Sequence, residues 1–210
     1  NAALAFFSEY VPTESIALAE TNDPTVHLLE VGRKKTKFFL DTLDPRFWLL
    51  HTTAQAQDAD AAVRNLVQRT PKLDAAWLPS YQLASWSSEL GTPRLLTAKF
   101  SVPTGLYQDD LPEEEFLDES LLLRIGSTGN ALERWNEYRE AEELSPSMAL
   151  WAARVARRRP NRDEVVIEDL TASGKLTCRG NSFRLHQEFL QGLRSRYAQL
   201  ITDWEARYRT

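Results

Sequence analysis

The fold of this chain is decided by a stretch near its C-terminus, residues 164–179, which reads EVVIEDLTASGKLTCR. Two strand-like segments, Glu164–Leu170 and Lys175–Arg179, flank the turn Thr171-Ala172-Ser173-Gly174. A short turn with glycine between two such segments is typical of a β-hairpin. The stretch therefore predicts that the C-terminal third combines strands with helices.

A long helix is expected directly after this hairpin. Apolar and aromatic side chains recur there at alternating spacings of four and three, which is typical of one helical face: His186, Leu190, Leu193, Tyr197, Leu200 and Trp204. Asn181 or Ser182 is a suitable capping residue for its first turn. Such a helix would be about 40 Å long and must pack across the molecule or against a partner. We therefore expect a protein partner or self-association through this helix, with Tyr197 and Trp204 as candidate contacts.

Two further helices are expected before the hairpin, separated by a very short turn. Asn130 followed by Glu133 resembles a capping arrangement for the first of them. Ser145-Pro146 is a suitable start for the second, and Pro160 ends it. The apolar face of this second helix would consist of Met148, Trp151, Ala152 and Val155. The C-terminal region is thus expected to run helix, helix, β-hairpin, long helix.

The N-terminal part of the chain alternates in the manner of a β-meander. The three segments with this pattern are Ser15–Glu20, Val26–Val31 and Thr36–Thr42. Phe47–Thr53 fits either a fourth strand or a helix. Two helices and two more strands should follow, at residues 58–71, 79–90, 94–102 and 121–125. The sequence therefore predicts an α+β protein with an acidic region at 1–126 and a basic region at 127–210, which could share one core.

Composition narrows the class of protein further. The chain has 210 residues, of which 42% are hydrophobic and 26% charged, and this balance excludes disorder and a disulfide-stapled miniature. Its one cysteine, Cys178, cannot form an internal disulfide, so a cytoplasmic location is expected. The N-terminal stretch becomes polar after Phe7, and no association with a membrane is expected.

Positive charge is concentrated at the C-terminal end. Residues 145–210 carry 12 basic and 7 acidic side chains, although the whole chain has a net charge of −5. The candidate nucleic-acid contacts in the predicted helix and hairpin are Arg154, Arg157, Arg158, Arg159, Arg162, Lys175 and Arg179. The order helix, turn, basic helix, hairpin is similar to that of a winged helix, which binds DNA. Alternatively, these arginines pair with acidic residues inside the protein.

Residues for catalysis are few. None of the three histidines has the spacing of a metal-binding pair, so His186 is expected to be a packed residue and Cys178 an inert buried thiol. We expect no cofactor and no metal. The leading hypothesis is a non-catalytic interaction module or accessory subunit, with nucleic acid as one candidate partner and an exposed Trp77 as a further anchor.

One enzymatic alternative stays open. Four polar residues around the predicted N-terminal hairpin could converge into a metal-dependent hydrolase or nuclease site, because such enzymes hold their cation with carboxylates: Glu30, Asp41, Asp44 and His51. This alternative requires that the four side chains lie together in one pocket.

Overall fold

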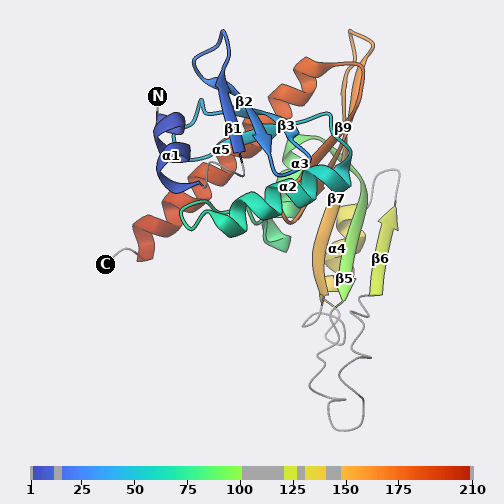
Figure 1. The fold of residues 1–210 in the computed structure, drawn as a ribbon. Helices are drawn as coiled ribbons and strands as arrows, with labels where there is room; N and C mark the ends of the chain where they lie inside the picture. Colours follow the sequence, from blue (N-terminus) through green and yellow to red (C-terminus); the bar gives the residue numbers. More distant parts are fainter. Residues whose placement is uncertain (1, 12–15, 101–120, 127–130, 141–147, 209–210) are drawn as a thin grey trace. The chain divides into compact units, whose positions relative to one another are not determined.

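The protein consists of two compact units, Asn1–Ala75 and Ala76–Thr210. The structure is a computed structural model that describes residues 2–11, 16–100, 121–126, 131–140 and 148–208 (Figure 1). The acidic segment 109–119 and the expected start at Ser145-Pro146 lie outside these residues. Each unit has its own sheet and its own core.

The first unit is an antiparallel meander with two helices. Helix α1 (Ala2–Tyr10) precedes strands β1 (Ile16–Glu20), β2 (Val26–Val31), β3 (Thr36–Asp41) and β4 (Leu49–His51), and helix α2 (Ala56–Arg69) ends the unit. The strands lie in the order β1-β2-β3-β4, and each neighbouring pair is antiparallel. The expected meander is therefore confirmed, and residues 49–51 form a strand.

Alternating apolar residues build the core of this unit. Side chains on one face of β2 and β3 are buried against both helices. The buried set comprises Phe7, Val11, Leu29, Val31, Phe38, Leu40, Ala62 and Leu66. The turn between β2 and β3 contains Gly32, whose φ of 73° suits glycine.

The second unit is built around a five-stranded sheet. Its elements are α3 (Ser80–Leu90), β5 (Thr92–Phe100), β6 (Leu121–Gly126), α4 (Ala131–Glu140), β7 (Met148–Arg159), β8 (Glu164–Thr171), β9 (Leu176–Gly180) and α5 (Phe183–Tyr208). The strands lie in the order β6-β5-β7-β8-β9, and all neighbours are antiparallel. The expected hairpin is confirmed as β8 and β9, and the α+β class holds for both units.

All three helices of the second unit cover the same face of this sheet. Leu83 of α3, Trp135 of α4 and Phe189 of α5 belong to one buried cluster. The strands contribute the side chains of a single face to that cluster, among them Leu96, Ala98, Ile125, Leu150, Ala153, Val155 and Leu170. The opposite face is covered by none of these helices, and we call it the helix-free face.

One expected helix is wrong. Residues 148–159 form the central strand β7, which pairs with β5 on one side and β8 on the other. Trp151 has no register partner on β5, because the pairing shifts between Leu150 and Ala152. This bulge adds one residue to the strand and separates the buried Leu150 and Ala153 by three positions instead of two. The interrupted alternation of this strand therefore resembled the spacing of a helix in the sequence. Because these residues form a strand, the expected winged-helix arrangement is also wrong.

The boundary between the units also differs from the expected one at residue 126. Strands β5 and β6 hydrogen-bond within the same sheet as β7, so residues 92–126 belong with the C-terminal part of the chain. The expected division separated these strands from their sheet, because pairing between distant segments leaves no local mark in a sequence. The observed boundary falls between Ala75 and Ala76, before α3.

The long final helix is confirmed as α5. The Ser182 hydroxyl accepts a hydrogen bond from the backbone N–H of Leu185 at 3.3 Å and so caps the first turn. The N-terminal half of α5 is packed on the sheet, whereas Trp204 is 55% exposed and Tyr208 is 75% exposed. In the described part of the chain, no helix is both long enough and apolar enough to span a membrane.

Candidate functional site

The basic residues of β7 point to two different faces of the sheet. Arg157 and Arg159 lie on the side of α5, where both contact the carboxylate of Glu188. Arg157 also donates a hydrogen bond to the Leu185 carbonyl at 2.8 Å. These two arginines therefore pair inside the unit and fasten β7 to the first turns of α5. For these two arginines the structure shows pairing inside the protein, with an acidic partner on the following helix.

The arginines around Glu188 determine its protonation state. Burial raises the pKa of its carboxyl, but Arg159, Arg184 and Arg157 together outweigh that effect and hold the pKa below its ordinary value. The carboxylate is thus ionised at neutral pH and remains paired with β7.

Arg154 and Arg179 lie on the helix-free face and share one acid. Nε of Arg154 is 2.6 Å from Oδ1 of Asp169, and an amino nitrogen of Arg179 is 2.6 Å from Oδ2. The hydrogen bond and the negative charge of Asp169 raise the pKa of Arg154 further above its already high value. Two positive charges are held in place by one negative charge, so this cluster keeps a net charge of +1.

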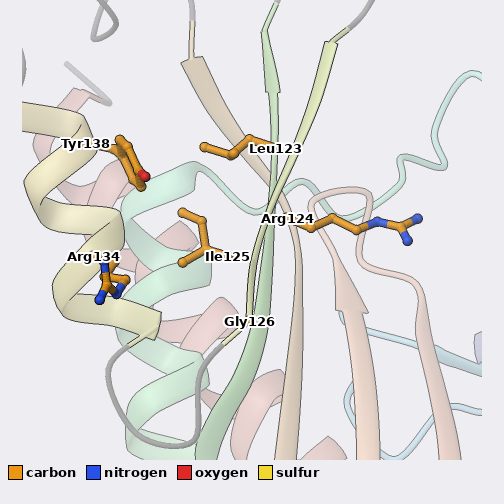
Figure 2. Close-up of a pocket in the computed structure, with 6 residues that line it drawn as sticks. All are labelled: Leu123, Arg124, Ile125, Gly126, Arg134 and Tyr138. Carbon is orange, nitrogen blue, oxygen red and sulfur yellow. The ribbon is translucent and has the colours of Figure 1, made fainter.

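Other basic side chains extend the same face across the sheet. Cross-strand register places Arg124 beside Thr97 and Arg158 beside Val165. Figure 2 shows Leu123 and Ile125 of β6 pointing toward α4 while Arg124 points to the opposite side. A shallow hollow between β6 and α4 is lined by these residues together with Arg134 and Tyr138.

We call the resulting surface the basic face. In the described strands it comprises Lys99, Arg124, Arg154, Arg158 and Arg179, with Asp169 as the one acid. Arg124 and Arg158 are exposed and have no ion-pair partner among the described residues. Arg162 lies in the β7–β8 turn, 4.0 Å from Glu164, and Lys175 lies in the β8–β9 turn. Of the seven basic residues expected from the sequence, three lie on this face.

Two tryptophans lie near Lys99 of the basic face, and one of them, Trp151, also packs against the helix-side core. The ammonium group of Lys99 is 4.3 Å from the ring centroid of Trp151. The ring of Trp77 lies 6.3 Å from that of Trp151, in an edge-to-face arrangement. Trp77 is 57% exposed, as the sequence predicted, and its backbone N–H donates a hydrogen bond to the hydroxyl of Tyr197. Tyr197 is therefore half-buried against its own unit.

The structure does not gather the four residues of the enzymatic alternative. Glu30 pairs across the strands with Lys37, whereas Asp41 lies opposite Val26 at the other end of the same hairpin. Four residues of strand separate these positions, which corresponds to about 13 Å. Asp44 accepts hydrogen bonds from the backbone of the turn that follows it.

A second group of polar side chains lies on the helix side of the sheet. Glu168 of β8 is fully buried and stands opposite Cys178 of β9. Nδ1 of His186, in the second turn of α5, lies 3.1 Å and 3.2 Å from the two carboxylate oxygens. The carboxylate, thiol and imidazole donor atoms all lie within 4.8 Å of one another. We call Glu168, Cys178 and His186 the Glu–Cys–His cluster.

The electrostatics of this cluster argue against a nucleophilic cysteine. Burial raises the pKa of Cys178 to about 12, and the charge of Glu168 and its hydrogen bond act in the same direction. A nucleophilic thiol needs the opposite arrangement, in which a neighbouring cation lowers the pKa. The cluster therefore holds a protonated thiol at neutral pH.

The rate of alkylation measures whether the Cys178 thiol is protonated. At pH 8 in EDTA, iodoacetamide should modify Cys178 in the native chain at least about 100-fold more slowly than in urea, since an unfolded thiol has a pKa of about 8.5. Because the folded pKa is the higher one, the contribution of this thiol to the free energy of unfolding falls between about pH 8.5 and pH 12. Equal rates in the native and unfolded chains at pH 8 would show that folding does not raise the pKa of this thiol.

Sequence reasoning missed this cluster because its members come from three elements. Cys178 and His186 were each interpreted alone, and no histidine adjoins Cys178 in the chain. One signal was present, since Glu168 occupies a position between the buried Val166 and Leu170. Strand alternation would have indicated a buried carboxylate at this position, and the register of the hairpin places Cys178 opposite to it.

These observations define an α+β protein of two compact units, the second of which has one helix-covered and one basic face. The chain belongs to the family of MJECL33-like proteins, whose family model matches residues 7–210. It is similar to the uncharacterized protein MJECL33 of Methanocaldococcus jannaschii, with 21% identity over 211 residues that cover 83% of this chain and 50% of that protein. The chain thus spans about half the length of this curated relative. No solved structure matches it.

Proposed function

We propose that this protein is a non-catalytic interaction module that binds nucleic acid through the basic face. The observation that carries the proposal is the gathering of five basic side chains from four strands around a single acid. Positive charge at this density, in a chain of net charge −5, favours a polyanionic partner.

The shape of the surface favours a single strand over a duplex. An open sheet offers a platform on which splayed bases can stack, whereas the major groove of a duplex admits a helix or a narrow ribbon. Trp151 and the exposed Trp77 would supply the stacking rings, and base stacking on such rings tolerates any sequence. Lys99 beside Trp151 would place a phosphate contact next to a stacked base.

The basic face contains only some of the basic residues that the sequence suggested as nucleic-acid contacts. Arg157 and Arg159 pair with Glu188 on the helix-covered side, so we do not include them among the nucleic-acid contacts. Arg124 and Arg158 are instead the exposed guanidinium groups that a phosphate would meet first. The guanidinium groups of Arg154 and Arg179 are held in place by Asp169, and their N–H groups that do not bond to Asp169 would be the ones to contact phosphate oxygens.

A salt titration tests this proposal. With four phosphate contacts, the affinity for a labelled single-stranded oligonucleotide should fall about 50-fold between 50 mM and 200 mM salt. The double variant Arg124→Ala/Arg158→Ala should reduce the slope of log K against log salt by about 1.4, because two contacts are lost. Fluorescence polarisation with single-stranded and double-stranded oligonucleotides measures both quantities.

The matched control carries the same change of charge on the other unit. Arg33 and Arg64 are exposed residues of the first unit, and Arg33→Ala/Arg64→Ala should leave the salt slope unchanged. Binding that both double variants weaken equally would be a response to net charge alone, and it would overturn the assignment of the basic face. Absence of binding at 50 mM salt would overturn the proposal altogether.

A further inference from the structure

The Glu–Cys–His cluster joins three elements at one buried point. Its donors come from β8, β9 and α5, and the Glu168 side chain is fully buried. On β8 this carboxylate lies between Val166 and Leu170, which are both buried and apolar. A carboxylate in such surroundings is costly unless positive charge and hydrogen bonds compensate it. The thiol of Cys178 contributes a proton but no charge.

We propose that this cluster is a binding site for Zn²⁺ or a divalent transition metal of similar chemistry. A carboxylate, a thiolate and an imidazole are the three donor types that proteins use for zinc, and the combination of sulfur and nitrogen disfavours Ca²⁺ and Mg²⁺. Two anionic donors and one neutral donor also balance the charge of a divalent cation, which removes the cost of burying the Glu168 carboxylate.

The distances require only small movements. Zinc-bound donors in a tetrahedron lie roughly 3.3–3.7 Å apart, given bonds of about 2.0–2.3 Å. The three donor atoms here already lie within 4.8 Å of one another, and the His186–Glu168 pair is at 3.1 Å. Cys178 and Glu168 lie opposite each other on β8 and β9, so rotation of the side chains is the movement that would bring the thiolate closer.

The cluster leaves one coordination position for solvent. The side chain of His186 is 15% exposed and Cys178 is partly exposed, whereas Glu168 is closed off from water. A metal held by these three residues would therefore face solvent on one side, which is the arrangement of zinc sites that exchange a water or another ligand. The site would also fasten the hairpin to α5.

A titration with cobalt can test this site specifically, because the sequence has a single cysteine. Cys178 is the one cysteine of the sequence, so an absorption band of thiolate-to-cobalt charge transfer can report on this site alone. The full chain is treated with EDTA, dialysed and titrated with Co²⁺, and separately with Zn²⁺ while its Tm is followed. We expect one Co²⁺ per chain with the thiolate band, and a Tm that rises with the concentration of Zn²⁺.

Three variants and one control separate the site from adventitious binding. Cys178→Ser should abolish the band, and His186→Gln and Glu168→Gln should each weaken Co²⁺ binding at least tenfold. His51→Gln makes the same substitution on the first unit and should change neither property. Far-UV circular dichroism of the metal-free variants shows which are folded. If the buried Glu168→Gln does not fold, Cys178→Ser and His186→Gln decide the question.

Two results would overturn the proposal. One is the absence of a thiolate band and of any Tm shift in the unaltered chain at millimolar metal. The other is a band whose affinity is unchanged in folded His186→Gln, because the cysteine would then bind metal without its neighbours. Neither result depends on whether the basic face binds nucleic acid.

Discussion

Replacement of Trp135 by alanine should lower the free energy of unfolding of the second unit by about 3–5 kcal/mol, which is typical for the loss of a buried aromatic side chain. Trp135 is 2% exposed, and together with Ala131 it forms the buried surface of α4. Its ring belongs to the cluster that contains Ile125 of β6 and Leu150 of β7. Removal leaves a cavity that α4 can fill only by shifting along the sheet.

Urea denaturation followed by far-UV circular dichroism measures this loss. The transition midpoint should fall while the slope m stays constant. This would show that the free energy of unfolding has fallen, whereas the surface exposed on unfolding has not changed. Tyr138→Ala on the same helix is the matched control, because Tyr138 is 38% exposed and the change in helix propensity is similar. Equal losses in the two variants would show that α4 does not pack through Trp135.

Gly180→Ala is expected to destabilise the second unit by more than about 2 kcal/mol, because alanine disfavours this backbone and meets a steric clash. The φ of Gly180 is 155°, and an added Cβ would lie 2.2 Å from the carbonyl oxygen of Val165. The backbone must shift to accept it. Since Gly180 connects the strand of Cys178 to the helix of His186, the shift would also disturb the Glu–Cys–His cluster.

Gly126→Ala provides the comparison for this substitution. A Cβ at Gly126 would meet only the Leu95 side chain, at an ordinary contact distance of 3.5 Å. We expect a change within about 0.5 kcal/mol for this exposed position, measured by the same urea titration. A similarly small effect of Gly180→Ala would mean that the β9–α5 connection adapts without cost.

The elements predicted correctly are those with local signals. The β8–β9 hairpin is marked by its glycine-bearing turn, and α5 by a long apolar stripe with a capping residue. Ser182 is that cap, while the amide of the neighbouring Asn181 bridges the backbone of Asp163 and Val165. Periodicity and turn residues act over a few positions, so a single sequence is enough to reveal them.

Strand β7 shows where such signals fail. Its sequence is rich in alanine and arginine, which favour helices, and the extra residue at Trp151 interrupts the alternation. Hydrogen bonding on both sides determines its structure instead. The same error affected the candidate site, because Arg157, Arg158 and Arg159 were all assigned to one basic helix. On a strand, Arg158 points away from its two neighbours.

The sequence separation of residues that contact each other bears on how the second unit folds. Glu168 and His186 are 18 positions apart, whereas β5 and β7 join residues as distant as Thr92 and Ala156. Contacts between near neighbours in the chain close small loops and form quickly, while distant pairings wait for a large loss of chain entropy. We therefore expect the corner formed by β8, β9 and the start of α5 to form early, and the distant pairing of β5 with β7 to form after it.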